Sequence, residues 1–311
     1  MKNYYTLLLV LMCAYFGNAQ QDAQYTQYMY NTQVINPGYI GSKEALSFGL
    51  LYRSQWVGFD GAPKTATFTV SKPFGELKQS SLGLSLVMDK IGPSTETNLV
   101  VDYSYSLILS EEGRLSFGVK AGVDLLNVDY TKLNIYDSND VQFSDNLESK
   151  LQPQLGAGVY YNTNKLYLGL SVPNLLNSKH YNSENLDDIN ADAYAIDRLH
   201  YFFIAGYVAS ISDEVKFKPA TMLKFVSGSP LQVDLSGNFL INDKFTIGAS
   251  YRWDAAISAM AGFQINNKMF IGMGYDFQTT DVEDYSDGSF EIFLKFDVFE
   301  KIEKILTPRF F

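Results

Sequence analysis

Side-chain polarity alternates with a period of two residues along almost the whole chain after residue 45, and this pattern limits the possible folds more than any other feature. In residues 290–298 one face carries Phe290, Ile292, Leu294, Phe296 and Val298. The opposite face carries charged residues of both signs, Glu291, Lys295 and Asp297. Because successive residues of a strand point to opposite faces, such a segment is a strand with one apolar and one polar face. The chain is therefore predicted to be all-β.

About fourteen segments follow this pattern, an even number, as single-chain bacterial outer-membrane barrels require. They cover approximately residues 46–53, 65–72, 81–89, 99–109, 117–125, 155–162, 165–172, 199–210, 215–226, 231–240, 247–253, 256–266, 269–277 and 290–298. Charges of both signs on one face fit a water-filled lumen better than a dry core. The pattern predicts a transmembrane outer-membrane β-barrel of about 14 antiparallel strands over residues 46–299.

The connections and the aromatic residues favour the same fold. Tight polar turns are expected at residues 112–113, 162–164, 242–243 and 266–267, and they alternate with long acidic segments at 128–152, 173–197 and 278–288. This asymmetry is typical of short periplasmic turns and larger extracellular loops. Aromatic residues near the strand ends are expected in an interfacial girdle: Tyr103, Tyr105, Tyr160, Tyr161, Tyr207, Tyr251, Trp253 and Tyr275. A soluble β-sandwich also alternates, but it needs no such girdle.

The first nineteen residues are predicted to be a cleaved signal peptide. Lys2 supplies the positive start, residues 7–12 begin the apolar core, and residues 17–19 are small enough for cleavage. The single cysteine, Cys13, lies inside this segment, so the exported protein is expected to carry no thiol chemistry. A lipoprotein anchor at Cys13 is disfavoured because a bulky methionine precedes it. No later run of about 18 apolar residues suggests a membrane-spanning helix.

Charge and composition exclude some functions. The formal net charge of -10, without a Lys/Arg cluster, argues against nucleic-acid binding. Acidic residues gather in the expected loops around residues 137–148, 184–192 and 281–287. Solvated loops are the simpler interpretation, and none of these runs has the full ligand spacing of a calcium loop. No metal or cofactor site is therefore predicted.

No set of residues predicts catalysis. The two histidines, His180 and His200, have no metal-ligand spacing. A hydrolase would need a nucleophile, a base and an orienting group in one place, and only Asp197 beside His200 hints at such a group. The chain is not expected to be an enzyme.

Residues 20–45 do not alternate, and they contain Asn36-Pro37-Gly38. Proline lacks an amide donor and restricts the residue before it, so strand pairing is interrupted there. We expect a non-strand plug or docking segment over residues 20–45. A short tail, residues 300–311, follows the last strand.

Three motifs near the N-terminus carry a family resemblance: QYTQYMYN at residues 24–31, INPGYIGS at 35–42 and YRSQWVGFDGAP at 52–63. Together with the ending PRFF at 308–311, they resemble the PorP/SprF family of outer-membrane proteins of type IX secretion and gliding motility in Bacteroidota. The resemblance implies a location in the cell outer membrane, in contact with its lipid. It also implies that the partners are the ring and motor proteins of the secretion machinery, or the C-terminal domain of a secreted adhesin. No catalytic residues come with it.

The same tract supplies the candidate site. Aromatic and amide side chains lie close together there, as at many protein interfaces. Partner binding is the hypothesis for Tyr25, Gln27, Tyr28, Asn36, Pro37, Arg53, Gln55 and Trp56. Alternatively these residues seal the lumen, with Arg53 paired to an inward aspartate. The alternative function on the same scaffold is a porin or hydrophobic-solute channel.

Overall fold

The computed structural model describes residues 24–132, 146–176 and 199–298. The predicted signal peptide and C-terminal tail lie outside these residues and stay predictions. Within the described ranges, no helix is both long enough and apolar enough to cross a membrane.

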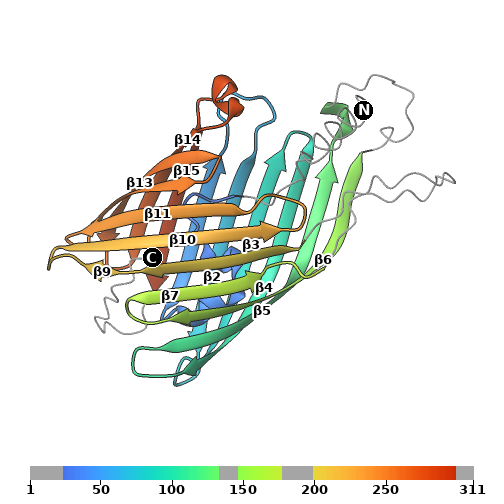
Figure 1. Ribbon diagram of the computed structural model, residues 1–311. Helices are drawn as coiled ribbons and strands as arrows, with labels where there is room; N and C mark the ends of the chain where they lie inside the picture. Colours follow the sequence, from blue (N-terminus) through green and yellow to red (C-terminus); the bar gives the residue numbers. More distant parts are fainter. Residues whose placement is uncertain (1–23, 133–145, 177–198, 299–311) are drawn as a thin grey trace, which may run out of the picture.

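The described strands form one closed antiparallel sheet (Figure 1). They are β1 (Leu46–Ser54), β2 (Lys64–Phe74), β3 (Ser80–Ile91), β4 (Ser94–Ile108), β5 (Arg114–Val128), β6 (Leu147–Asn162), β7 (Leu166–Val172), β8 (His200–Tyr207), β9 (Ala209–Ser210), β10 (Val215–Val226), β11 (Gln232–Ile241), β12 (Phe245–Arg252), β13 (Ala256–Asn266), β14 (Met269–Gln278) and β15 (Ser289–Val298). Both β8 and the short β9 pair with β10, so they count as one strand of the wall. Each strand pairs with its neighbours in the chain, and β1 pairs with β15, which closes the barrel. The predicted barrel of 14 antiparallel strands is confirmed.

Polar side chains face the interior and apolar side chains face outward, as lipid contact requires. In β4, Asp102, Ser104 and Ser106 are fully buried, whereas the intervening Tyr103 and Tyr105 are exposed on the outer surface. The outer surface is therefore a hydrophobic band, and the polar groups of the chain gather inside the barrel.

The two ends of the barrel differ. The chain leaves the wall at residues 129–132 and 173–176, and makes the connection 279–288, at one end of the barrel, called here the long-loop end. The short turns at 75–79, 109–113, 163–165, 211–214, 242–244 and 267–268 lie at the other, the short-turn end. The expected alternation of long and short connections is not strict, because residues 92–93, 227–231 and 253–255 make tight hairpins at the long-loop end. Positive φ angles at Gly92, Gly228 and Asp254 permit these turns.

The aromatic residues follow the expected girdle with one exception. Tyr103, Tyr105, Tyr207, Tyr251 and Trp253 are exposed on the outside of the barrel. Tyr160, however, points inward, where its ring packs edge-on against Tyr39 at 5.4 Å. The prediction for Tyr160 was wrong because Tyr160 and Tyr161 are adjacent in one strand, so they cannot both face lipid.

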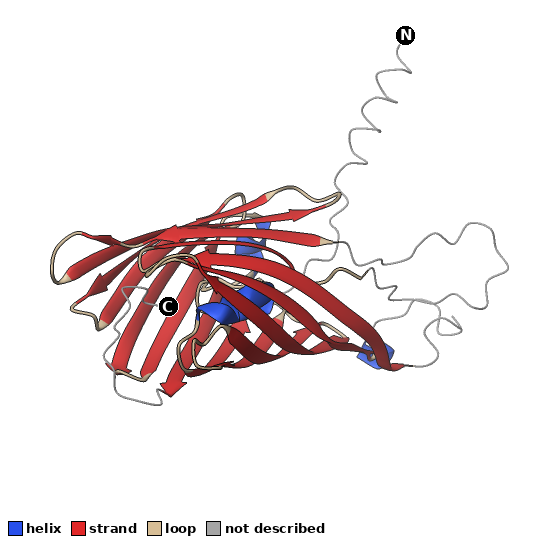
Figure 2. Ribbon diagram, turned by 90° about the horizontal axis from the view of Figure 1, so that it is seen from below, coloured by secondary structure: helices blue, strands red, loops and turns tan. Residues whose placement is uncertain are grey.

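Residues 24–45, called here the N-terminal segment, run through the barrel (Figure 2). They include α2 (Thr32–Ile35) and η1 (Pro37–Ser42), while η2 (Tyr130–Lys132) and η4 (Asp281–Tyr285) lie in long loops. Asn36 starts η1, because its Oδ1 accepts a hydrogen bond of 2.9 Å from the Gly38 amide. Pro37 fits the first helical position, which needs no amide donor. The motif that breaks strand pairing therefore begins a helical turn inside the barrel.

Small wall residues make room for this segment. A Cβ atom on Gly118 of β5 would lie 2.2 Å from the Gly38 amide nitrogen. A Cβ atom on Gly158 of β6 would lie 2.3 Å from Asn36 Oδ1. No side chain fits at such distances, so these two glycines allow the segment to approach the backbone of the wall.

Candidate functional site

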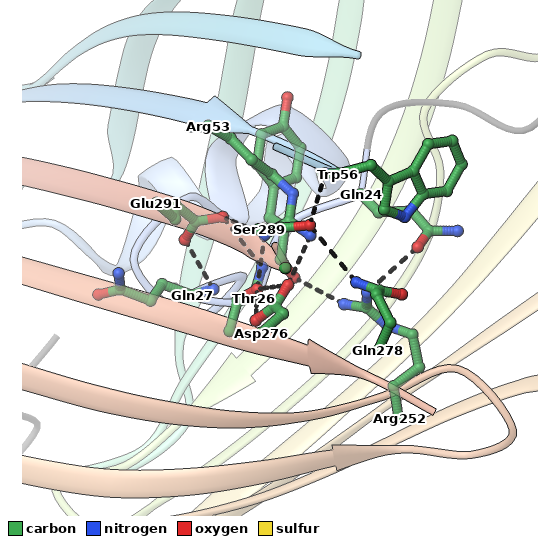
Figure 3. Close-up of polar contacts among 12 residues, drawn as sticks. Gln24, Thr26, Gln27, Arg53, Trp56, Arg252, Asp276, Gln278, Ser289 and Glu291 are labelled. Carbon is green, nitrogen blue, oxygen red and sulfur yellow. Dashed lines mark hydrogen bonds and ion pairs between the residues drawn. The ribbon is translucent and has the colours of Figure 1, made fainter. Parts of the chain in front are cut away.

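Three charged side chains of adjacent strands meet inside the barrel near the long-loop end (Figure 3). Arg53 of β1 lies 2.6 Å from Asp276 of β14 and 3.4 Å from Glu291 of β15. The register brings them together, because Arg53 pairs with Glu291 and Asp276 pairs with Ser289 two residues away. All three side chains are at most 1% exposed. We call this group the carboxylate cradle.

The carboxylate cradle holds the beginning of the N-terminal segment. The two oxygens of Glu291 accept hydrogen bonds from the successive backbone amides of Thr26, at 3.0 Å, and Gln27, at 2.9 Å. The Thr26 hydroxyl donates to Asp276 at 2.7 Å and accepts from Arg53 at 2.7 Å. The wall supplies one cation and two anions here, and two main-chain amides of the segment provide further hydrogen-bond donors to them.

A second ion pair continues this contact around the wall. Arg252 of β12 lies 2.7 Å from Asp234 of β11. The same guanidinium donates to the Gln24 side chain at 3.1 Å and to the Tyr25 carbonyl at 3.3 Å. Residues 24–27 are held through three backbone groups and through the side chains of Gln24, Tyr25 and Thr26. The wall residues that bind them come from six strands, because Thr67 of β2 and Gln232 of β11 also take part.

Farther down the barrel, the segment packs against strands on several sides. The Tyr30 ring stacks on Phe270 and Phe293, with centroids 5.0 and 5.2 Å away. Lys120 of β5 donates to the Val34 carbonyl at 2.6 Å and lies 3.7 Å from Asp102. Contacts of this kind on several sides mean that the segment occupies the lumen.

Above the carboxylate cradle, two long-loop-end connections pair with each other. We call residues 55–63 and 279–288 the loop pair. Val57 donates to the Gly288 carbonyl and accepts from the Asp287 amide, both at 2.8 Å. The Trp56 amide donates to Ser289 Oγ at 3.0 Å (Figure 3). These bonds hold Trp56 at a φ of 44°, in the left-handed region, which is a rare and strained conformation for so bulky a residue.

The structure separates the predicted site residues into two groups. Tyr25, Gln27, Tyr28, Asn36, Pro37 and Arg53 are buried inside the barrel. Gln55 and Trp56 are partly exposed in the loop pair. The alternative in which Arg53 pairs with an inward aspartate is confirmed, and Asp276 is that residue. The partner-binding role of the eight residues stays a prediction, and for the buried six it would require the segment to move.

The expectation of a wet lumen needs correction at this face. Arg53, Asp276 and Glu291 are covered by the N-terminal segment and are not open to lumen water. Thr26 and the wall residues Asp234, Asp276 and Glu291 were not among the predicted site residues. The alternation placed the two carboxylates of β14 and β15 on the inner face, but it did not reveal which segment they contact. The course of the N-terminal segment through the lumen supplies that information.

A comparison with known protein families identifies the family of this chain. The model of the family "Type IX secretion system membrane protein PorP/SprF" matches residues 17–296. This chain belongs to that family. The match covers the carboxylate cradle, the N-terminal segment and nearly all of the barrel, so this PorP/SprF protein is an outer-membrane protein. No curated protein matches the chain.

Several solved structures are similar to this PorP/SprF protein at low sequence identity. The Acinetobacter baumannii outer membrane protein Omp33 is 9% identical, with a TM-score of 0.46, over 82% of this chain and 99% of that one. A monoaromatic hydrocarbon channel, CymD, is 11% identical, with a TM-score of 0.48, over 91% and 95%. A Pseudomonas aeruginosa FadL homologue is 12% identical, with a TM-score of 0.47, over 86% and 94%. These likenesses say nothing about the function of the PorP/SprF protein.

The histidines and the acidic loops do not form a further site within the described residues. His200 is buried at the start of β8, with its ring 6.4 Å from Phe202, whereas His180 and Asp197 lie outside the described residues. In the part of the chain that the structure describes, no group of three or more His, Cys, Asp or Glu side chains is arranged for a metal ion. Most of the acidic residues around 137–148 and 184–192 fall outside that part.

Proposed function

We propose that this PorP/SprF protein serves type IX secretion and gliding motility by binding a protein partner at the outer membrane, without catalysing a reaction. The family match over residues 17–296 is the observation that carries the proposal. It is supported by the occupied lumen, because a barrel whose interior is filled offers its ends, rather than a pore, for function.

Of the two partner classes, we propose the secreted adhesin over the ring and motor proteins. In outer-membrane barrels the larger loops face the cell exterior, where an adhesin is held. The loop pair at this end is ordered by its own hydrogen bonds and displays Phe59, 51% exposed, and Tyr285, 71% exposed. Rigid, exposed aromatic side chains are the usual anchors of protein interfaces.

Trp56 is the residue of the loop pair that we expect to matter most. A left-handed conformation at a non-glycine residue costs about 1–3 kcal/mol and persists only where surrounding contacts impose it. Here the amide contact with Ser289 and the bonds between residue 57 and residues 287–288 impose it. Such strain favours a role in positioning the indole ring. Arg53, three residues earlier, anchors the same strand end to the wall.

The experiment uses the adhesin whose surface display is lost when the gene for this protein is deleted. Trp56→Ala should reduce its co-purification with the barrel and its display at the surface. The matched control is Trp253→Ala, which removes the other tryptophan of the chain, located in a different turn at the same end. Loss of ring and motor proteins from the complex, with the adhesin retained, would favour the other partner class. Unchanged secretion and co-purification in Trp56→Ala and Arg53→Ala would remove these residues from the proposal.

A porin or solute channel remains the alternative function and predicts a different measurement. A porin needs an open lumen, whereas residues 24–45 lie inside this one. A steady open conductance of the purified wild-type protein in planar bilayers would favour the porin. We expect a closed or rarely open barrel.

A further inference from the structure

The contacts between the carboxylate cradle and the N-terminal segment have the character of ligand recognition. Glu291 binds two successive amides, and Arg252 binds a carbonyl, so these two wall residues contact the main chain of the segment. Other wall contacts reach side chains, namely Arg252 to Gln24 and Thr67 of β2 to the Tyr25 hydroxyl. The one side-chain feature that the carboxylate cradle itself recognises is the Thr26 hydroxyl. Any polypeptide that forms the same turn, with two free amides and a hydroxyl on the first residue, could make the same hydrogen bonds with the carboxylate cradle.

The buried charges of the carboxylate cradle also favour a role in ligand recognition. Without the segment, one guanidinium would face two carboxylates in the lumen, and nothing in the described wall would donate to both oxygens of Glu291. Buried charges are costly unless every lone pair is satisfied, and apolar residues of similar size commonly serve stability better. A wall that keeps these charges at this position is suited to binding peptide groups.

The way in which the N-terminal segment is attached also allows it to leave the carboxylate cradle. Residues 24–27 lie near the long-loop end, while the chain enters the wall at Leu46, at the opposite end of the barrel. The cradle end is thus held by non-covalent contacts alone among the described residues. Part of the interface is also imperfect, since the buried side-chain amide nitrogens of Gln27 and Asn31 have no hydrogen-bond partner within the described part of the chain. Buried polar groups without a partner carry a desolvation cost, which weakens the binding of the segment to the wall.

We propose that the carboxylate cradle is a polypeptide-binding site, which the chain fills with its own residues 24–27 and which a segment of a second polypeptide that forms the same turn can take over. The residue that occupies the position of Thr26 is threonine or serine, and the residue that follows it is not proline. Arg53, Asp276 and Glu291 bind the incoming backbone as they bind residues 26 and 27. The inference does not rest on the role in secretion, since the purified barrel alone tests it.

The test is binding of a fluorescent peptide of residues 24–31 to the purified full-length protein in detergent. In the variant Thr26→Val/Gln27→Pro the chain's own segment loses its hydroxyl and one amide, so the site should become free. We expect the peptide to bind this variant at least about tenfold more tightly than the wild type, which is already occupied. Adding Glu291→Gln should then weaken binding by about tenfold or more, because charge-assisted hydrogen bonds are lost.

The matched control is the same peptide carrying valine and proline in place of the threonine and the following glutamine, and it should not bind. Equal binding of both peptides, or equal binding to wild type and variant, would overturn the proposal, as would binding unaffected by Glu291→Gln. Heat-modifiable mobility on gels checks that each variant is a folded barrel. If the double variant does not fold, the single variant Thr26→Val takes its place. Failure of the peptide to bind a folded variant would also overturn the proposal.

Discussion

Arg53 of β1 reaches across β15 to Asp276 of β14, with 2.6 Å between Nη2 and Oδ2, and both side chains are 1% exposed. Glu291 lies between them on β15 and accepts the amides of the N-terminal segment. The carboxylate cradle therefore joins three wall strands to a segment that belongs to none of them.

Replacing Arg53 should destabilise the barrel more than replacing Lys216, a partly exposed cation. Arg53→Ala leaves two buried carboxylates without their cation, which costs about 3–5 kcal/mol. The control is Lys216→Ala, which removes an ion pair of the same length, 2.6 Å, between Lys216 and the exposed Asp243. That loss should cost about 0–1 kcal/mol. Urea unfolding in detergent, followed by tryptophan fluorescence, measures both, and equal losses would contradict the prediction.

A methyl group on Gly118 should displace the N-terminal segment while the sheet remains intact. The added Cβ of Gly118→Ala would meet the Gly38 amide nitrogen at 2.2 Å, a backbone atom that must move. The control is Gly274→Ala, whose Cβ would meet the end of the Gln27 side chain at 3.3 Å. A cysteine in place of the buried Thr32 reports the movement.

The measurement is the rate of maleimide labelling at that introduced cysteine. The only native cysteine, Cys13, lies in the predicted signal peptide and would be absent from the exported protein. Labelling should be faster in the Gly118→Ala background and unchanged in the Gly274→Ala background. Slow labelling in both would mean that the segment tolerates the clash.

How far the sequence predicts this structure depends on the range of the interactions involved. The strand containing Glu291 is evident from local alternation, because one face is apolar and the other charged. Its contact with Arg53, 238 residues away in sequence, depends on which strands close the barrel. Tyr160 and Tyr161 show the same limit, since the alternation requires one of them to face inward but does not say what that ring meets.

The sequence also predicts only part of the structure of the N-terminal segment. Its lack of alternation and its proline predict correctly that residues 24–45 are not a wall strand. Its course through the lumen is not encoded in any local pattern. It depends on the glycines of β5 and β6 and on charges of five other strands. Only the three-dimensional arrangement places these side by side.

A double-mutant cycle should show that Lys120 and Asp102 act together under the segment. Lys120 lies 3.7 Å from Asp102 and also donates to the Val34 carbonyl. Lys120→Met alone leaves Asp102 as a buried uncompensated charge and should cost about 3–5 kcal/mol. Adding Asp102→Asn removes that charge and keeps a polar group near Gln33. The double variant should therefore be more stable than the sum of the single effects by about 0.5–3 kcal/mol. Additive losses in urea unfolding would show that the two residues are independent.

The two tryptophans should respond differently to lipid. Trp253 is 67% exposed and follows the outward-facing Tyr251, at the height expected for an interfacial aromatic residue. Trp56 is only partly exposed, and its amide is bonded within the loop pair. In vesicles of lipids brominated near the headgroup, the Trp56→Phe protein, which emits from Trp253, should be strongly quenched. The Trp253→Phe protein, which emits from Trp56, should be quenched less because the loop pair holds its indole away from the bilayer. Stronger quenching of the Trp253→Phe protein would place Trp56 against lipid and argue against its role as a partner contact.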